Sequence, residues 1–435
     1  FNAFASDATD YKALVCVFLK GGMDNFETLI PFDQPSYNEY ESLREPLLSR
    51  YDANQSRRRS QLLALNGDVS GRSFGFPREF APLHELYENG NLAVIGNVGP
   101  LIEPIDKAAY ENRSGHLPPN LFSHNDQQSV WMASQPEGAR FGWGGRFAEI
   151  MHAATTNTHA AFTTVSTSGA SVFLTGNSLK PFVVGRTQAA NVQGLNRGPS
   201  LGLGSNSFYE IYESTLRDAD VSRSSLFKRD MVSMMNSALD NNAIFNEQLA
   251  LPGGPNTDFP ASQLGGQLNL IAESIAMREA LGMKRQIFFV SIGGFDTHSR
   301  QSEELPVLQA EVANAIGAFY QSLIELGLEN SVTTFTASDF GRTLGVNGDG
   351  TDHGWGGHQL VVGGAVNGGR IYGDVPPAVL NHNHAAGRGR LIPTLSVDQY
   401  AASLGRWFGL SESDLADSLP GLQNFDSGAL NGLLS

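Results

Sequence analysis

The sequence predicts an α/β protein with a largely parallel sheet, and three observations lead to this prediction. Short apolar runs that end in glycine or polar residues recur along the chain. Segments with apolar residues at spacings of three and four, as on one face of a helix, separate several of these runs. The chain has 435 residues with 41% hydrophobic composition, which is enough to bury a large core.

Five apolar runs have the length and composition of strands that are buried on both faces. They are residues 13–19, 92–96, 285–292, 331–337 and 359–366. The helical patterns are residues 223–250, 264–282, 305–327 and 396–410. Because strands alternate with helices, right-handed crossovers and parallel neighbours are expected.

Two segments are rich in Gly, Asn, Ser and Pro, namely residues 176–207 and 251–262. Such a composition predicts surface loops or an elaboration on the main sheet. We therefore expect one domain over residues 1–435, with a loop or helical elaboration around 176–262.

The formal net charge of −15 limits the expected partners. A surface this acidic repels phosphate backbones, so nucleic acid is not an expected partner. The chain has no run of 18 apolar residues, so no transmembrane segment is expected. It begins without methionine or a recognisable leader, which fits a mature product after signal removal or a trimmed chain. The one cysteine, Cys16, is expected to be a buried core residue.

Acidic and imidazole side chains lie next to the ends of the predicted strands. They are Asp24, Asp296, His298 and Asp339, together with His353 and His358 of the glycine-rich stretch TDHGWGGHQ. Ligands of an open parallel sheet bind at the carboxyl ends of its strands, so these side chains can meet there. Carboxylate oxygen and imidazole nitrogen suit zinc, manganese or iron. A structural zinc site built on cysteines is excluded, because only one cysteine is present.

Each of these residues also has a purely structural interpretation. Asp24 follows a double glycine and could stabilise a turn. Asp296, Thr297 or Asp339 could cap the N-terminus of a helix. A single histidine is more often a hydrogen-bonded structural residue than a metal ligand. The combination of residues, rather than any one of them, predicts a shared polar or metal site.

A second motif is LFSHNDQQSVW, residues 121–131. Ser123 and Asp126 fit a variant of the capping box at the start of a helix. The free N–H groups at that helix end can hold an anionic ester, to which Ser123 would present its hydroxyl. Activation of the hydroxyl needs a metal or a base, and His124 is the adjacent candidate. Downstream, Arg146 in RFGWGGR could hold an anion or face solvent.

Six motifs in order along the chain carry a resemblance to a known family. They are LVCVFLKGGMDNFETLIP, LFSHNDQQSVW with GWGGR, GGFDTHS, SDFGRTLGVNG, DHGWGGHQLVVGGAVNGGRIYG and IPTLSVDQYAASLGRWFG. Together they resemble the bacterial family of unknown function DUF1501, over about residues 12 to 425. The resemblance implies an alkaline-phosphatase-like three-layer sandwich, with a mostly parallel central sheet and helices on both faces. It also implies twin-arginine export, so we expect a periplasmic or extracellular protein.

The wider alkaline phosphatase and sulfatase superfamily implies metal-binding roles for particular residues. Asp24 would bind metal after the first strand, and Asp296 and His298 would bind it after a later strand. Asp339 matches a further ligand position. Phe340 follows it where the superfamily has histidine or asparagine, which puts a second metal in doubt.

The same resemblance implies a last ligand and a nucleophile. Either His353 or His358 would supply the final histidine before the last core strand. Ser123 is the closest match to the nucleophile at a helix N-terminus. The Cys/Ser-x-Pro/Ala-x-Arg motif of sulfatases lacks its arginine here, which disfavours a standard sulfatase.

We expect an exported metal-dependent hydrolase of phosphate or sulfate esters. Ser123 would attack, and Arg146 or Arg342 would neutralise developing charge. The expected cofactor is one or two divalent ions of zinc, manganese or calcium, and the expected substrate is a small anionic ester. The alternative is a non-catalytic exported binding or assembly protein that keeps the fold with a degenerate metal site. A homo-oligomer fits both interpretations.

Overall fold

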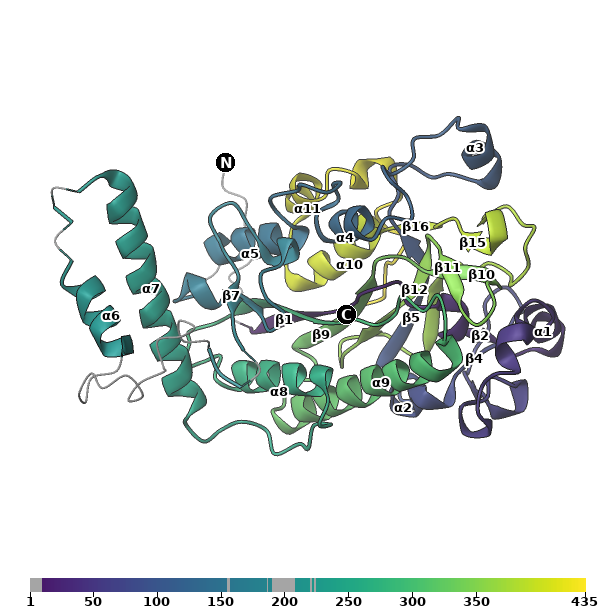
Figure 1. The fold of residues 1–435 in the computed structure, drawn as a ribbon, viewed down its shortest axis with the longest axis horizontal. Coiled ribbons are helices and arrows are strands. Elements are labelled where there is room, and N and C mark those ends of the chain that lie inside the picture. The colour runs from purple at the N-terminus through teal and green to yellow at the C-terminus, as the bar shows by residue number, and fades with distance from the viewer. Residues whose placement is uncertain (1–9, 155–156, 186, 190–207, 220, 223) are drawn as a thin grey trace.

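A nine-stranded sheet forms the centre of the computed structural model, which describes residues 10–154, 157–185, 187–189, 208–219, 221–222 and 224–435 (Figure 1). The strand order is β13-β5-β12-β9-β1-β8-β6-β7, and β16 pairs with β5. The strands are β1 (Lys12–Leu19), β5 (Leu92–Gly99), β6 (Thr164–Ser166), β7 (Phe182–Val183), β8 (Arg285–Ile292), β9 (Val332–Ser338), β12 (Gly357–Val362), β13 (Arg370–Gly373) and β16 (Leu395–Ser396). Neighbouring strands are parallel except at β12, which runs antiparallel to β5 and β9. The predicted α/β class with a mostly parallel sheet is confirmed.

Helices cover both faces of the sheet, so the molecule has three layers (Figure 1). One face carries α2 (Ala81–Glu88), α8 (Gln263–Ala276) and α9 (Gln301–Glu325), and the other carries α4 (His124–Ala133), α5 (Trp143–Ala154), α10 (Val397–Phe408) and α11 (Glu412–Ser418). Side chains of β1 alternate between the layers: Val15 and Val17 pack under the first group, whereas Cys16 and Phe18 pack under the second. Because both faces are covered, every position of the strand from Ala13 to Leu19 is apolar and buried. Cys16 is the buried core residue that the sequence predicts.

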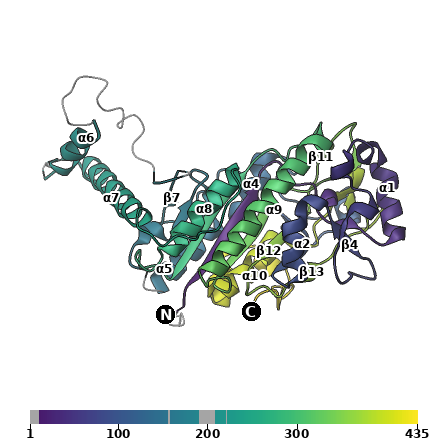
Figure 2. The same ribbon diagram turned by 90° about the horizontal axis from the view of Figure 1, so that it is seen from below.

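All the predicted strands and helical segments are present, with shifts of a few residues at their ends. The pattern at 223–250 corresponds to α7 (Leu226–Leu249), except that residue 223 lies outside the described residues. Helices α6 (Phe208–Arg217) and α7 project from one end of the molecule (Figures 1 and 2). Of the predicted elaboration, residues 186, 190–207, 220 and 223 lie outside the described residues.

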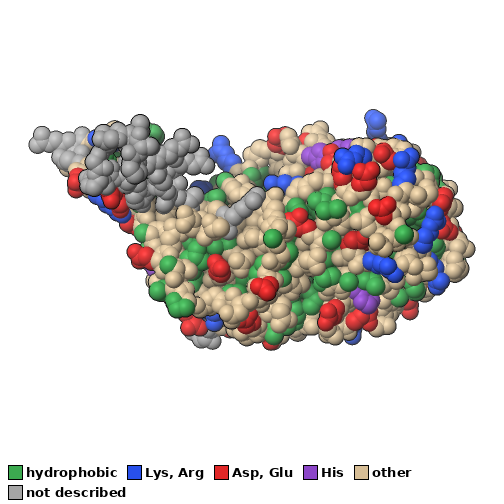
Figure 3. Space-filling model, turned by 60° about the horizontal axis from the view of Figure 1, so that its bottom comes forward, with side chains coloured by type: hydrophobic (Ala, Val, Ile, Leu, Met, Phe, Trp, Pro, Cys, Tyr) green, Lys and Arg blue, Asp and Glu red, His purple; other side chains and the backbone are tan. Residues whose placement is uncertain are grey.

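Further helices and strands complete the fold around the sheet. They are α1 (Gln34–Leu48), α3 (Lys107–Asn112), β2 (Ile30–Pro31), β3 (Leu63–Ala64), β4 (Phe74–Phe76), β10 (Arg342–Val346), β11 (Thr351–His353), β14 (Ala385–Ala386) and β15 (Arg390–Leu391). Acidic side chains are spread over the face shown in Figure 3, in line with the net charge of −15. No helix of the described chain combines the length and the apolar character that crossing a bilayer requires.

The direction of β12 decides where the glycine-rich stretch lies. Asp296 and Asp339 follow β8 and β9, at the edge of the sheet where these parallel strands end. Residues that precede a parallel strand would lie at the opposite edge. Because β12 runs antiparallel to β9, His353 and the other residues before it lie at the same edge as the two aspartates.

Candidate metal centre

Three side chains from distant parts of the chain converge at the carboxyl edge of the sheet. His124 begins α4, Asp296 follows β8, and His353 ends β11. One ligand atom of each residue lies within 4.8 Å of the other two. His124 Nε2 is 3.4 Å from Asp296 Oδ2, and His353 Nε2 is 3.1 Å from Asp296 Oδ1. Figure 3 shows histidine side chains gathered with acidic and basic ones at one edge of the molecule.

A third imidazole borders the same carboxylate. His298 Nε2 is 3.0 Å from Asp296 Oδ1 and 2.9 Å from His353 Nε2. Its Nδ1 lies 3.5 Å from Asp352, whose other oxygen is 2.8 Å from Arg388. The structure therefore brings together a donor set of three imidazoles and one carboxylate.

In His124 and His353, the ring nitrogen that points away from Asp296 is Nδ1. In both residues this atom faces a hydrogen-bond acceptor. His124 Nδ1 is 2.6 Å from Asp339 Oδ2, and His353 Nδ1 is 2.8 Å from the carbonyl oxygen of Phe122. A ring nitrogen that faces such an acceptor carries the proton, so the opposite nitrogen presents its lone pair. Both Nε2 atoms face Asp296 and are the ring nitrogens available to an ion. Histidines that bind metal ions are held in this way by outer partners.

The charges around the centre keep Asp296 ionised. Arg342 is fully buried at the start of β10, and its Nη1 donates to Asp296 Oδ1 at 2.7 Å. Burial alone would raise the pKa of Asp296, but the hydrogen bond and charge of Arg342 outweigh it and lower this pKa. The pKa of His124 is raised, mainly by its hydrogen bond to Asp339, and that of His353 is lowered, mainly by burial.

Two backbone features support the imidazoles. Phe122 has a φ of 73°, which a bulky residue rarely adopts, and its carbonyl oxygen is the acceptor for His353. Gly354 packs so closely on the start of β10 that an added Cβ would lie 2.5 Å from the carbonyl oxygen of Gly341. Glycine therefore allows the stretch TDHGWGGHQ to wrap against its neighbour.

Asp24 lies in a buried ion-pair network rather than in the histidine cluster. Arg44 Nη1 is 2.7 Å from Asp24 Oδ2, and Arg44 Nη2 is 3.2 Å from Oδ1. Gln301 and the backbone N–H of Phe26 donate to the same carboxylate at 2.7 and 3.0 Å. Arg44 also contacts Glu27 at 3.1 Å. The cation next to Asp24 is thus a guanidinium, and sequence reasoning missed Arg44 because it lies inside an ordinary amphipathic helix, α1.

His358 is buried in β12 and is not part of the cluster either. Its Nδ1 accepts a hydrogen bond from the backbone N–H of Asn97 at 3.1 Å. Burial disfavours the charged imidazolium and lowers the pKa of His358 to about 4. Of the two histidines between which the sequence could not decide, His353 is the one that faces Asp296.

The low pKa of His358 predicts a pH dependence of stability. Between its ordinary pKa near 6.5 and about 4, the unfolded chain binds a proton that the folded chain does not. The free energy of unfolding should therefore fall by roughly 3 kcal/mol as the pH falls through this window. His358→Asn keeps an acceptor for Asn97 and should remove this part of the pH dependence. Urea unfolding at pH 7 and pH 4.5 would measure it, and equal losses in both proteins would contradict the prediction.

The two remaining predicted residues lie beside or away from the centre. Ser123 is the N-cap residue of α4, as predicted, but its hydroxyl donates to Asp126 at 2.9 Å and caps no backbone N–H. The predicted capping box is therefore not formed. Arg146 donates to the carbonyl oxygens of Ser418 and Phe141, at 2.8 and 3.4 Å. It neither contacts the cluster nor faces solvent freely.

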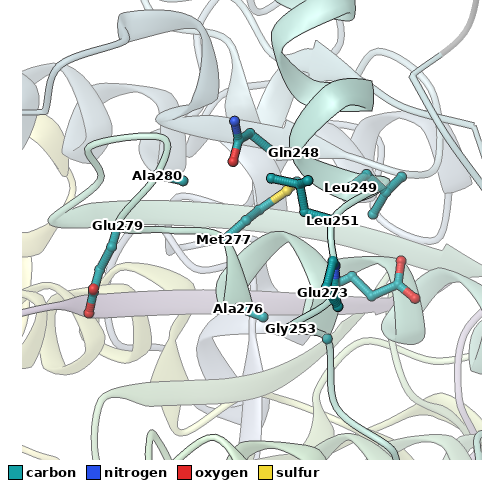
Figure 4. A pocket seen from close by; sticks show the side chains of 11 residues that line it. Gln248, Leu249, Leu251, Gly253, Glu273, Ala276, Met277, Glu279 and Ala280 are labelled. Carbon is teal, nitrogen blue, oxygen red and sulfur yellow. The ribbon is translucent and has the colours of Figure 1, made fainter.

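A separate pocket of about 480 Å³ lies between the end of α7 and α8 (Figure 4). Leu249, Leu251, Met277 and Glu273 are among the residues that line it. None of its lining residues belongs to the histidine cluster, so the chemistry proposed below does not involve this pocket.

Comparisons with known proteins give one family and distant likenesses to solved structures, two of which are described here. The model of the family described as "Protein of unknown function (DUF1501)" matches residues 11–417. No curated protein matches the chain. The solved structure of Ps i-CgsB in complex with k-i-k-neocarrahexaose is similar at 10% identity and a TM-score of 0.38, covering 96% of this chain and 78% of that one.

The second solved structure is a Bacteroides thetaiotaomicron protein described with the metabolism of multiple glycosaminoglycans. It is 12% identical, with a TM-score of 0.36, and the alignment covers 93% of this chain and 74% of that one. Both likenesses are too distant to assign an activity.

Proposed function

We propose that this chain, which belongs to the DUF1501 family, is a metal-dependent hydrolase of phosphate or sulfate esters. One observation carries the proposal: imidazole Nε2 atoms from His124, His298 and His353 surround the carboxylate of Asp296. Location outside the cytoplasm stays a prediction of the family resemblance.

The donor set fits a transition-metal ion. His298 and His353 place their Nε2 atoms 2.9 Å apart, and both rings have an acceptor near Nδ1. Two lone pairs at that distance repel each other unless a proton or a cation lies between them. Imidazole nitrogen with carboxylate oxygen suits zinc or manganese, whereas calcium prefers oxygen ligands alone. We therefore propose zinc or manganese rather than calcium.

The chain's own residues would bind and orient an anionic ester. A divalent ion held by His124, His353 and Asp296 would polarise the ester and stabilise the charge that develops on its oxygens. Arg342 adds a fixed positive charge 2.7 Å from Asp296. The N-terminus of α4, with Ser123 as its N-cap, offers free backbone N–H groups to the same anion.

Turnover with added metal tests the proposed function. Protein stripped with a chelator and then loaded with zinc or manganese should hydrolyse aryl phosphates, aryl sulfates or both, and the stripped protein should not. Metal binding without turnover of either ester class would contradict hydrolysis and support the non-catalytic alternative.

Ser123→Ala separates a serine nucleophile from other attacking groups. If Ser123 attacks the ester, kcat should fall by roughly 100-fold or more, while the metal content stays unchanged. Ser49→Ala, at an exposed position after α1, is the matched control and should keep full turnover. Unchanged kcat in Ser123→Ala would remove Ser123 from the proposed chemistry and leave the metal centre in place.

A further inference from the structure

Helix α4 presents two donors to one carboxylate oxygen. His124 and Gln128 are four residues apart, so they lie on the same face of the helix. His124 Nδ1 is 2.6 Å from Asp339 Oδ2, and Gln128 Nε2 donates to the same oxygen at 2.9 Å. The sequence shows this arrangement only as H-x-x-x-Q on a helix, with the aspartate more than 200 residues away.

These two donors alone bond the Asp339 carboxylate in the described part of the chain. Asp339 is fully buried, and its second oxygen, Oδ1, has no hydrogen-bond partner among the described residues. A buried carboxylate is stable only when hydrogen bonds replace the lost water. Because Oδ1 has no partner among the described residues, only the bonds to Oδ2 orient the carboxylate. Of these two bonds, the one from the Gln128 amide holds Oδ2 in position for His124.

We propose that Gln128 is a positioning residue for the metal centre. By holding Oδ2 of Asp339 against His124 Nδ1, it keeps the proton on Nδ1 and leaves Nε2 free to bind an ion. The role concerns orientation, because Gln128 contacts Asp339 and not Asp296. Its effect on metal affinity rests on the proposed metal centre, whereas its effect on the His124 ring exists in the metal-free protein as well.

Gln128→Met removes the donor at nearly constant volume and tests the proposal. Zinc affinity, measured by competition with a chromophoric chelator, should weaken about tenfold, as expected for loss of a partner behind a metal-binding histidine. Gln321→Met, the same change at an exposed position of helix α9, should leave the affinity unchanged. Gln128→Lys restores a donor and should return the affinity to within about threefold of wild type.

A second readout needs no metal. The side-chain ¹⁵N shifts of histidine-labelled, metal-free protein, with His124 assigned from His124→Gln, should report a proton on Nδ1 in the wild type. Gln128→Met should shift His124 toward a mixture of tautomers, and Gln321→Met should not. Unchanged tautomer and unchanged zinc affinity in Gln128→Met would overturn the positioning role, even if the wild type hydrolyses esters. A wild type that binds zinc but hydrolyses neither ester would overturn only the proposed function.

Discussion

Zinc binding should weaken by at least about 100-fold when Asp296 is replaced by asparagine, because the substitution removes the central charged ligand. The amide has the same shape, and water reaches the 44% exposed Asp296 side chain, but the buried Arg342 loses its ionic partner, so the change should cost roughly 1 to 3 kcal/mol of unfolding free energy. Isothermal titration of the chelator-treated protein with zinc measures the affinity, and urea unfolding measures the stability.

The matched control for this change is Asp417→Asn, which removes the same charge from an exposed position of α11. It should bind zinc like the wild type. Wild-type zinc affinity in Asp296→Asn would contradict the proposed metal centre, because among the described residues Asp296 is the carboxylate that all three imidazoles border.

Asp24→Asn should have the opposite pattern, with a large loss of stability and little loss of metal. The change leaves the guanidinium of Arg44 buried beside a neutral amide, with Glu27 as its remaining ionic partner. Removing one partner of a buried ion pair costs about 3 kcal/mol or more. Urea unfolding in the presence of a chelator measures this cost without any contribution from bound metal.

The ion pair itself can be isolated with a double-mutant cycle. Asp24→Asn and Arg44→Gln together should destabilise less than the sum of the two single changes, because neither partner is then left as an unpaired charge. The opposite result is that Asp24→Asn lowers the free energy of unfolding by less than about 1 kcal/mol and abolishes zinc binding. That result would mean that Asp24 is a metal ligand.

The sheet could be predicted from the sequence because its strands are buried on both faces. Strand β1, for example, is apolar at every position from Ala13 to Leu19, and both layers of helices need that apolar surface. The antiparallel direction of β12 could not be predicted in the same way. Its apolar run looks the same in either direction, and pairing with β5 and β9 is a long-range property.

The residues of the centre were predicted better than their roles. Their position after β8 places Asp296 and His298 at one edge, whereas His353 reaches the same edge because β12 is antiparallel. His124 was proposed as a base beside Ser123 rather than as a ligand. Asp339 lies behind His124 rather than beside Asp296. The atom that a side chain directs at the centre depends on long-range contacts, such as the hydrogen bond from Gln128 to Asp339. The sequence contains no pattern that predicts such contacts.

For the buried side chains of Asp24 and His358, too, the sequence could not predict which groups they contact. A carboxylate after the first strand suggests a metal ligand, but the sequence cannot show that Arg44 from α1 reaches it. Likewise, two histidines five residues apart look equivalent in TDHGWGGHQ. Only the start of β12 between them places His353 at the centre and buries His358 within the sheet.

Anomalous diffraction from crystals grown with zinc or manganese tests the metal centre most directly. We predict one strong peak within bonding distance of His124 Nε2, His353 Nε2 and Asp296, with no peak at Asp24. The account would be contradicted by crystals that show no peak at these residues, or by an ion bound to Asp24 in place of Arg44.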